Sequence, residues 1–285
     1  MNICFVMRKI AGRGGGAERV LVDVANELAA RGHHLEILSY EPRRVAPFYP
    51  LRFGVRHINL LKPKKAQSRF ERFVDKYITA PLLRLPLVGP IGKLNWYLTH
   101  VPFTKALRRH IVANAPDVVV AWMPPSYAPV VAACRGTGTR RLASTHNEPS
   151  QDYENPLRWD PNPLDRRIRL NALGEMDQFA VLLPEYKDWY PAEIGKRAVA
   201  IPNAVAKVDE QILATAERGK LILSVGRLAD VKRHEVLIRA WAELGKEFPD
   251  WRVLILGEGP NKEALQALIG ELGLDGKVKL GGQEI

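Results

Sequence analysis

Two cations follow a predicted strand in the second half of the chain. Residues 221–225 form an apolar run that predicts a buried parallel strand and stops at Gly226, and Arg227 and Lys232 come soon after it. A strand that leads through a glycine turn to a helix favours anion binding, because the first N–H groups of the helix lack partners and its dipole is positive there. A guanidinium and an ammonium together suit the two phosphates of a departing nucleotide. The alternative is a solvated loop that carries two surface cations.

A histidine is the candidate in the first half. His146 lies at the carboxyl end of a predicted strand, residues 141–146, and is followed by Asn147 and Glu148. In parallel sheets, ligands bind at the carboxyl ends of strands. A single histidine is more often structural than catalytic, so both interpretations stay open.

A glycine-rich loop, GRGGGAER at residues 12–19, connects the first predicted strand with the first predicted helix. Its glycines let a ligand approach the backbone. Gly12, Gly14 and Ala17 also match the G-x-G-x-x-A fingerprint of nicotinamide dinucleotide binding, and Glu41 follows the next strand, where a ribose-binding acid would sit. Residues 8–11 separate the strand from Gly12, although in that fingerprint the first glycine follows at once. An NAD-dependent oxidoreductase therefore remains an alternative.

These residues need parallel sheets to position them. An amphipathic pattern predicts the first helix at residues 17–31. Apolar runs predict strands at residues 2–7, 35–39, 117–122, 141–146, 179–184 and 198–202. After residues 201–205 the pattern restarts, with strands at 220–226, 252–257 and 277–280 and helices at 233–248 and 262–271. We expect an α/β protein with two doubly wound, Rossmann-like domains, residues 1–203 and 204–285. The second has only three strands, and we expect it to be incomplete.

The positive charge is concentrated in one segment. The chain has a net charge of +11, and residues 43–110 hold fifteen Lys or Arg against Glu71 and Asp75. Prolines and bases interrupt this segment, so it cannot supply the roughly 20 apolar residues of a membrane span. Bases interleaved with large apolar residues favour binding to an anionic membrane surface, with these side chains entering the boundary: Phe70, Phe73, Tyr77, Leu82, Leu83, Trp96 and Tyr97. The alternative is a helical excursion packed on the first domain.

Composition and motifs also argue against a nucleic-acid partner and against a secreted, oxidising location. A nucleic-acid partner is not expected, because no zinc spacing, RNP-like aromatic motif or recognition helix accompanies the basic charge. Cys4 and Cys134 give neither a disulfide framework nor a metal-ligand spacing, which fits a reducing compartment. No signal peptide is visible. We therefore expect a cytoplasmic location.

Several motifs in order resemble those of the family-four retaining glycosyltransferases of the GT-B type. They are GGGAERVLVDVANELAARGH at residues 14–33, STHN at 144–147, IPNAV at 201–205, GRLADVKRHEVLIRAW at 226–241 and RVLILGEGP at 252–260. The resemblance implies two Rossmann-like domains that face each other across a cleft, with sugar transfer from a nucleotide sugar, UDP-sugars being the expected class.

The resemblance also implies roles for individual residues. Gly15 and Gly16 would approach the donor phosphate or the acceptor, and His146 would contact the transferred sugar. Arg227 and Lys232 would hold the diphosphate leaving group and stabilise its charge. Gln283 falls where the family's backbone meets the nucleobase.

The absence of an Asp-x-Asp motif agrees with a transferase that needs no metal and no cofactor. Family members retain the anomeric configuration, by front-face attack assisted by the leaving phosphate. Relatives with such a glycine loop extend lipid-diphosphate-linked oligosaccharides, which would fit cell-envelope polysaccharide or glycoconjugate synthesis at the inner face of the cytoplasmic membrane.

One departure affects the expected activity. The family's Glu-x7-Glu motif, whose acids bind donor sugar and ribose, has no counterpart before residue 285. The chain therefore resembles the front three-quarters of such an enzyme, and we expect it to be inactive alone. A non-catalytic GT-B-like binding module is the other alternative. The donor sugar, acceptor, linkage and oligomeric state cannot be read from the sequence.

Overall fold

A computed structural model describes residues 1–63, 89–156, 158–160, 162–205 and 219–282. The chain divides into two compact units, Met1–Val205 and Ala206–Ile285. Each unit has its own parallel sheet and its own apolar core. Gln283 and residues 64–88 of the basic segment, with five of its large apolar side chains, lie outside the described residues.

The first unit is built on a seven-stranded sheet in which every neighbouring pair is parallel. Its strands are β1 (Asn2–Val6), β2 (His34–Ser39), β3 (Val55–Asn59), β4 (Val118–Trp122), β5 (Arg140–Ser144), β6 (Gln178–Val181) and β7 (Ala198–Ala200). Their order is β3-β2-β1-β4-β5-β6-β7. The order reverses between β1 and β4, and ligands of such sheets bind at this switch point, beyond the carboxyl ends of the strands.

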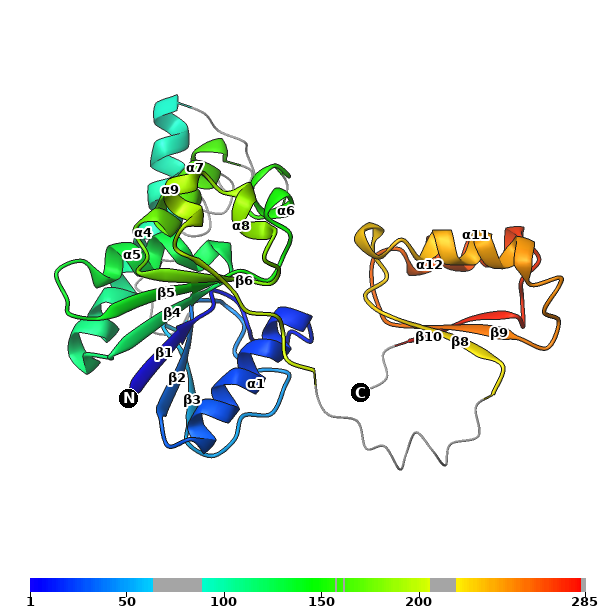
Figure 1. The fold of residues 1–285 in the computed structure, drawn as a ribbon, viewed down its shortest axis with the longest axis horizontal. Coiled ribbons are helices and arrows are strands. Elements are labelled where there is room, and N and C mark those ends of the chain that lie inside the picture. Colours follow the sequence, from blue (N-terminus) through cyan, green and yellow to red (C-terminus); the bar gives the residue numbers. More distant parts are fainter. Residues whose placement is uncertain (64–88, 157, 161, 206–218, 283–285) are drawn as a thin grey trace. The chain divides into compact units, whose positions relative to one another are not determined.

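Helices cover both faces of this sheet (Figure 1). On one face α1 (Gly16–Ala30) packs through Leu21, Val22 and Ala25. The other face is covered mainly by α4 (Gly89–Asn114), α5 (Tyr127–Cys134) and α7 (Pro163–Gly174). Shorter helices complete the unit: η3 (Pro124–Ser126), α6 (Pro149–Tyr153), α8 (Tyr186–Trp189) and α9 (Ala192–Gly195). Burial on both faces explains why the central strands read as continuous apolar runs.

The described part of the basic segment belongs to this unit. It supplies strand β3, which was not predicted because its sequence, VRHIN, lacks an apolar run. It also supplies α4, whose Trp96 is half-buried and donates through Nε1 to Asp165 Oδ1 over 3.0 Å. Trp96 is therefore not free to enter a membrane boundary, whereas Tyr97 is 61% exposed. No helix among the described residues is long and apolar enough to span a membrane.

The second unit has a three-stranded parallel sheet in the order β10-β9-β8. Its elements are β8 (Leu221–Val225), η4 (Asp230–Lys232), α11 (His234–Leu244), β9 (Arg252–Leu256), α12 (Lys262–Glu271) and β10 (Val278–Gly282). Helices α11 and α12 pack on one face of the sheet (Figure 1). The expectation that β8 is a buried strand was wrong, because Leu221, Leu223 and Val225 point to the other face, where they are 46%, 54% and 71% exposed.

Candidate functional site

His146 lies two residues beyond β5, next to the switch point of the first sheet. Its ring stacks on Trp122, the last residue of β4, with ring centroids 4.3 Å apart. Ser144 Oγ is 2.9 Å from its Nε2, and Asn203 Oδ1 is 3.2 Å from its Nδ1. An amide oxygen only accepts, so Nδ1 carries the proton and Nε2 accepts from the Ser144 hydroxyl. The surrounding protein thus fixes both the plane and the tautomer of the imidazole.

Burial lowers the pKa of His146 to about 4, although the hydrogen bond to Asn203 opposes this effect. The ring is therefore neutral at pH 7. A neutral imidazole with one protein partner on each nitrogen is suited to holding a fixed position and less suited to carrying a proton.

The glycine loop is tied to the same place. Trp122 donates through Nε1 to the carbonyl of Ala17 over 3.0 Å, which joins the first turn of α1 to the end of β4. At Gly15 an added Cβ would lie 2.3 Å from Glu18 Oε2, whereas at Gly16 it would meet nothing within 4 Å. A side chain at Gly15 would therefore require the flexible Glu18 carboxylate to move. Gly16 faces open space and leaves the helix start accessible to a ligand.

Glu41 does not fit the role of a ribose-binding acid. Its carboxylate is 3% exposed, and Oε1 accepts from the backbone N–H groups of Ile10 and Ala11 at 2.7 and 2.9 Å. These bonds hold the segment between β1 and the glycine loop, so the carboxylate has a structural role. This geometry argues against the oxidoreductase alternative.

Sequence reasoning missed the cations that follow β1, namely Arg8, Lys9 and Arg13. Burial lowers the pKa of Lys9, and the charges of Arg8 and Arg13 lower it further. Arg8 donates to the carbonyl of Thr99 over 3.2 Å. Among the described residues, the side chains of Lys9 and Arg13 form no ion pair. The sequence RKIAGR already shows three bases close together directly after the first strand. Because they follow β1, they make this edge of the sheet basic, which favours an anionic ligand.

In the second unit, Arg227 and Lys232 lie in the connection between β8 and α11. Both are exposed, and within the described part of the chain neither side chain forms an ion pair or hydrogen bond. Lys232 belongs to the short helix η4, and Arg233 adopts a left-handed conformation (φ +50°) before α11 begins at His234, one residue later than the expected start at 233. The helix start is therefore displaced from the glycine turn by a tight loop.

Two glycines after β9 hold that loop in place. A Cβ at Gly257 would lie 2.0 Å from the carbonyl oxygen of Gly226, and a Cβ at Gly259 would lie 2.1 Å from that of Leu228. Leu228 also donates its N–H to the carbonyl of Glu258 over 3.0 Å. Close backbone contact, which only glycine allows, thus fixes the segment that carries Arg227.

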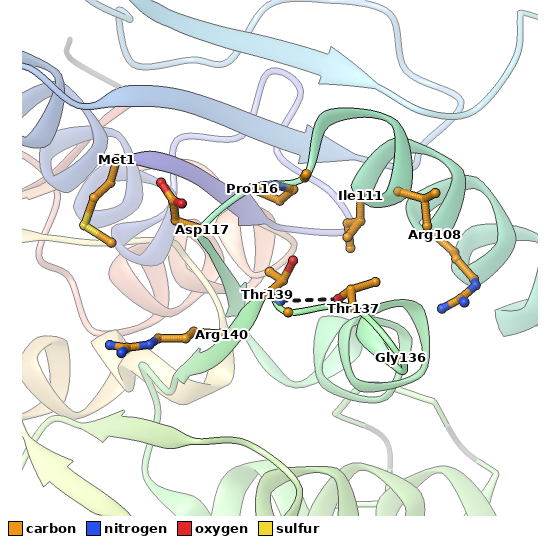
Figure 2. Close-up of a pocket in the computed structure, with 12 residues that line it drawn as sticks. Met1, Arg108, Ile111, Pro116, Asp117, Gly136, Thr137, Thr139 and Arg140 are labelled. Atoms are coloured by element: carbon orange, nitrogen blue, oxygen red, sulfur yellow. Dashed lines mark hydrogen bonds between the residues drawn. The ribbon is translucent and has the colours of Figure 1, made fainter.

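A cavity of about 820 Å³ among the described residues is not part of this site. Figure 2 shows that Met1, Asp117 and Arg140 line it, and these residues lie where β1, β4 and β5 begin. Because the strands are parallel, this is the edge of the sheet opposite to His146. The candidate site in the first unit lies at the carboxyl edge instead.

Comparison with known proteins gives matches over both units. The profile of Glycosyltransferase Family 4 matches residues 14–207, and that of Glycosyl transferases group 1 matches residues 206–284. A Campylobacter jejuni protein, N-acetylgalactosamine-N,N'-diacetylbacillosaminyl-diphospho-undecaprenol 4-alpha-N-acetylgalactosaminyltransferase, is 47% identical over 170 residues, which cover 55% of this chain and 44% of that protein. An uncharacterized glycosyltransferase of Haemophilus influenzae is 35% identical over 271 residues, covering 94% of this chain and 65% of that protein.

An exopolysaccharide phosphotransferase of Streptomyces coelicolor is 29% identical over 279 residues, covering 94% of this chain and 27% of that protein. The chain thus spans less than two thirds of the length of each of these relatives.

Among solved structures, sucrose-phosphate synthase of Thermosynechococcus elongatus superposes with a TM-score of 0.70 at 15% identity, covering 99% of this chain and 70% of that one. HepE of Anabaena, in complex with UDP and glucose, superposes with a TM-score of 0.63 at 16% sequence identity, covering 100% of this chain and 70% of that one. These similarities confirm the expected GT-B fold of two Rossmann-like domains.

Proposed function

The chain belongs to glycosyltransferase family 4, and we propose that it transfers a sugar from a UDP-sugar, with retention, to a phosphate-bearing, membrane-associated glycan acceptor. The observation that carries this proposal is the exposed pair Arg227 and Lys232, which has no acid partner among the described residues and stands on a loop fixed by glycine contacts. A cation pair in this state is available to an anionic ligand.

The leaving group sets the main chemical requirement. As the bond between sugar and diphosphate breaks, negative charge develops on the phosphate oxygens and must be stabilised. Arg227 presents two parallel N–H donors, and Lys232 presents a mobile point charge, so together they match a diphosphate. In this scheme they replace a metal cation, and the leaving phosphate assists attack on the same face without a protein nucleophile.

His146 contributes position and not proton transfer. Its neutral ring is held by Ser144, Asn203 and Trp122, and it offers a rigid surface against which sugar hydroxyls are oriented. Orientation of this kind lowers the barrier by fixing the reacting atoms before the reaction. Gly15 and Gly16 leave the backbone at the start of α1 accessible to donor phosphate or acceptor.

The acceptor side is inferred from charge. Lys9 precedes the glycine loop and Arg13 lies within it, and neither has an ion-pair partner among the described residues, which favours a ligand that carries phosphate. The C. jejuni relative is named for action on a diphospho-undecaprenol-linked glycan. We therefore propose a lipid-diphosphate-linked oligosaccharide, or a polysaccharide built on one, in cell-envelope synthesis.

A lipid-linked acceptor requires contact with the membrane. In α4, Ile91, Leu94 and Tyr97 are 59%, 57% and 61% exposed and recur every third residue, so they lie on one side of the helix. They belong to the segment that holds the basic excess of the chain. We propose that this segment binds anionic lipids at the inner face of the cytoplasmic membrane. A non-catalytic GT-B-like module remains the second candidate, because the chain spans only part of its relatives.

The test combines binding with turnover. A form of the protein that also includes the family's Glu-x7-Glu region, without which this chain is expected to be inactive, is incubated with a panel of UDP-sugars and undecaprenyl-diphosphate-linked glycans. Sugar transfer is followed by mass spectrometry, and UDP affinity is measured by calorimetry. UDP binding together with transfer supports the proposal. UDP binding without transfer to any acceptor supports the non-catalytic module, and absence of UDP binding contradicts both.

A further inference from the structure

A thiol, a carboxylate and an imidazole meet on the face of the first sheet that α4 covers. Cys4 of β1 is paired with Glu36 of β2, and Glu36 is paired in turn with Arg56 of β3, so the three side chains form a row across the sheet. His110 of α4 closes over this row, with Nε2 2.6 Å from Glu36 Oε2. The Cys4 thiol donates to the same oxygen over 3.6 Å.

The three donor atoms are arranged for one small ion. Cys4 Sγ, His110 Nε2 and a carboxylate oxygen of Glu36 all lie within 4.8 Å of one another. Cys4 is 3% exposed, and the side chains of Glu36 and His110 are 13% and 14% exposed, so little water competes. A set of one thiolate sulfur, one imidazole nitrogen and one carboxylate oxygen is suited to zinc, whereas magnesium and calcium prefer oxygen ligands alone.

Arg56 supports this arrangement from outside. It donates to Oε1 of Glu36, which leaves Oε2 directed at Cys4 and His110. An outer partner of this kind orients a ligating carboxylate and is a regular part of zinc sites.

A cavity provides access and room for a fourth ligand. Its volume is about 610 Å³, and Cys4 and Glu36 lie in its wall together with Asn114, which is one turn of α4 beyond His110. Zinc with three protein ligands usually completes its tetrahedron with water. The cavity is large enough to supply that water.

A second group of possible ligands, His100, Asp160 and Asp165, is less suitable. Asp165 already accepts from Trp96 at 3.0 Å and from Arg169 at 2.6 Å. Both carboxylate oxygens of Asp165 are thus occupied by groups that cannot bind a metal, whereas among the described residues Oε2 of Glu36 faces only the two other candidate ligands. A metal is therefore better placed at the cysteine.

We propose that Cys4, Glu36 and His110 bind one zinc ion, away from the carboxyl edge that carries His146 and independently of sugar transfer. On binding, the S–H bond of Cys4 breaks, the proton goes to solvent and sulfur bonds to zinc. Before binding, Nε2 of His110 donates its proton to the Glu36 carboxylate in a hydrogen bond. On binding, that proton moves to Nδ1 by exchange with solvent, the freed Nε2 lone pair binds zinc, and Glu36 binds through Oε2. The ion ties β1, β2 and α4 together and thereby stabilises the first unit.

The test uses metal-stripped protein without an affinity tag, titrated with cobalt chloride and then with zinc chloride. Cobalt bound to a thiolate gives a charge-transfer band in the near ultraviolet, so the readout does not depend on activity. We expect one cobalt per chain, displacement by zinc and a rise in the thermal midpoint with zinc. Cys134 on α5 is also buried and free and lies outside the donor group, so it offers a matched control.

Cys4→Ser should abolish the band, and Cys134→Ser should retain it. His110→Gln should weaken cobalt binding roughly tenfold or more. Circular dichroism and thermal melting establish that each variant is folded before titration. The proposal is overturned if the unmutated protein gives no thiolate band, if Cys4→Ser keeps the band, or if Cys134→Ser alone removes it.

Discussion

The imidazole of His146 stacks on the indole of Trp122 with ring centroids 4.3 Å apart. This contact joins the ends of β5 and β4, and Trp122 extends it to the glycine loop by donating to Ala17. Asn203, from the IPNAV segment, holds the other side of the ring. The glycine loop, the end of β4, the STHN segment and the IPNAV segment thus together fix one neutral histidine at the carboxyl edge of the sheet.

Replacing His146 by Ala should lower sugar transfer far more than it lowers stability, because the ring is half-buried and its role is to orient the sugar. Asn203→Ala should have a smaller effect, roughly two- to tenfold in rate, since one neutral hydrogen bond contributes about 0.5–1.5 kcal/mol. Initial rates at saturating donor test this. His33→Ala, at the opposite edge of the sheet, is the control. Equal rates for all four proteins would contradict the assignment.

Removing either diphosphate cation should weaken UDP binding. Arg227→Ala and Lys232→Ala each remove a charged hydrogen bond worth about 1.5–3 kcal/mol, which is roughly tenfold to a hundredfold in affinity. Arg239→Ala removes an exposed cation from α11 and should leave the affinity unchanged. Calorimetric titration with UDP measures all three, and a loss as large in Arg239→Ala would show that the effect is not specific.

A methyl group at Gly259 should destabilise the second unit. The added Cβ would lie 2.1 Å from a backbone oxygen, which cannot rotate away, and such overpacking costs about 1–3 kcal/mol. Gly270→Ala in α12 meets nothing within 4 Å and should stabilise by about 0.5–1 kcal/mol, because alanine favours a helix. Urea unfolding followed by the fluorescence of Trp241 and Trp251 distinguishes the two. Loss of stability in both variants would refute the contact argument.

The first unit should lose stability in mild acid. Burial lowers the pKa of His100 and of His146 to about 4, whereas an unfolded histidine has a pKa of about 6.5. Between these values the unfolded chain binds more protons than the folded one, so the free energy of unfolding is steady above about pH 6.5 and falls as pH drops toward 4. Chemical unfolding at a series of pH values measures the slope. His100→Asn should reduce it, and an unchanged slope would rule out this cause.

Membrane binding should depend on lipid charge and salt. Exposed charges are screened over about 8 Å at physiological ionic strength, so affinity for anionic vesicles should fall steeply as salt rises. Replacing Ile91 and Leu94 together by Ser should weaken binding to anionic vesicles further, while the same change at Val236 and Leu244, exposed residues of α11, should not. Vesicle co-sedimentation reports both effects. Equal binding to neutral and anionic vesicles would count against the proposal.

Local pattern determined most of the strands. The apolar runs of β1, β2 and β4 are long enough to bury on both faces, so their sequence alone identifies them. Strand β3 was missed because three of its five residues are polar, and pairing with β2 alone makes it a strand. Strand β8 was correctly predicted as a strand but wrongly expected to be buried on both faces. An apolar run does not show whether another element covers each face of the strand.

The candidate site divides in the same way. His146, Arg227, Lys232 and the glycine loop were found from residue type and position after a strand, since these signals lie within a few neighbouring residues. Their roles as donor-binding and catalytic groups, and that of Gln283, stay predictions. That Trp96 is held by Asp165, and that Cys4, Glu36 and His110 meet, was decided only by tertiary structure. These partners are separated by 32 to 74 residues in the chain, and only the strand order and the packing of α4 bring them within bonding distance.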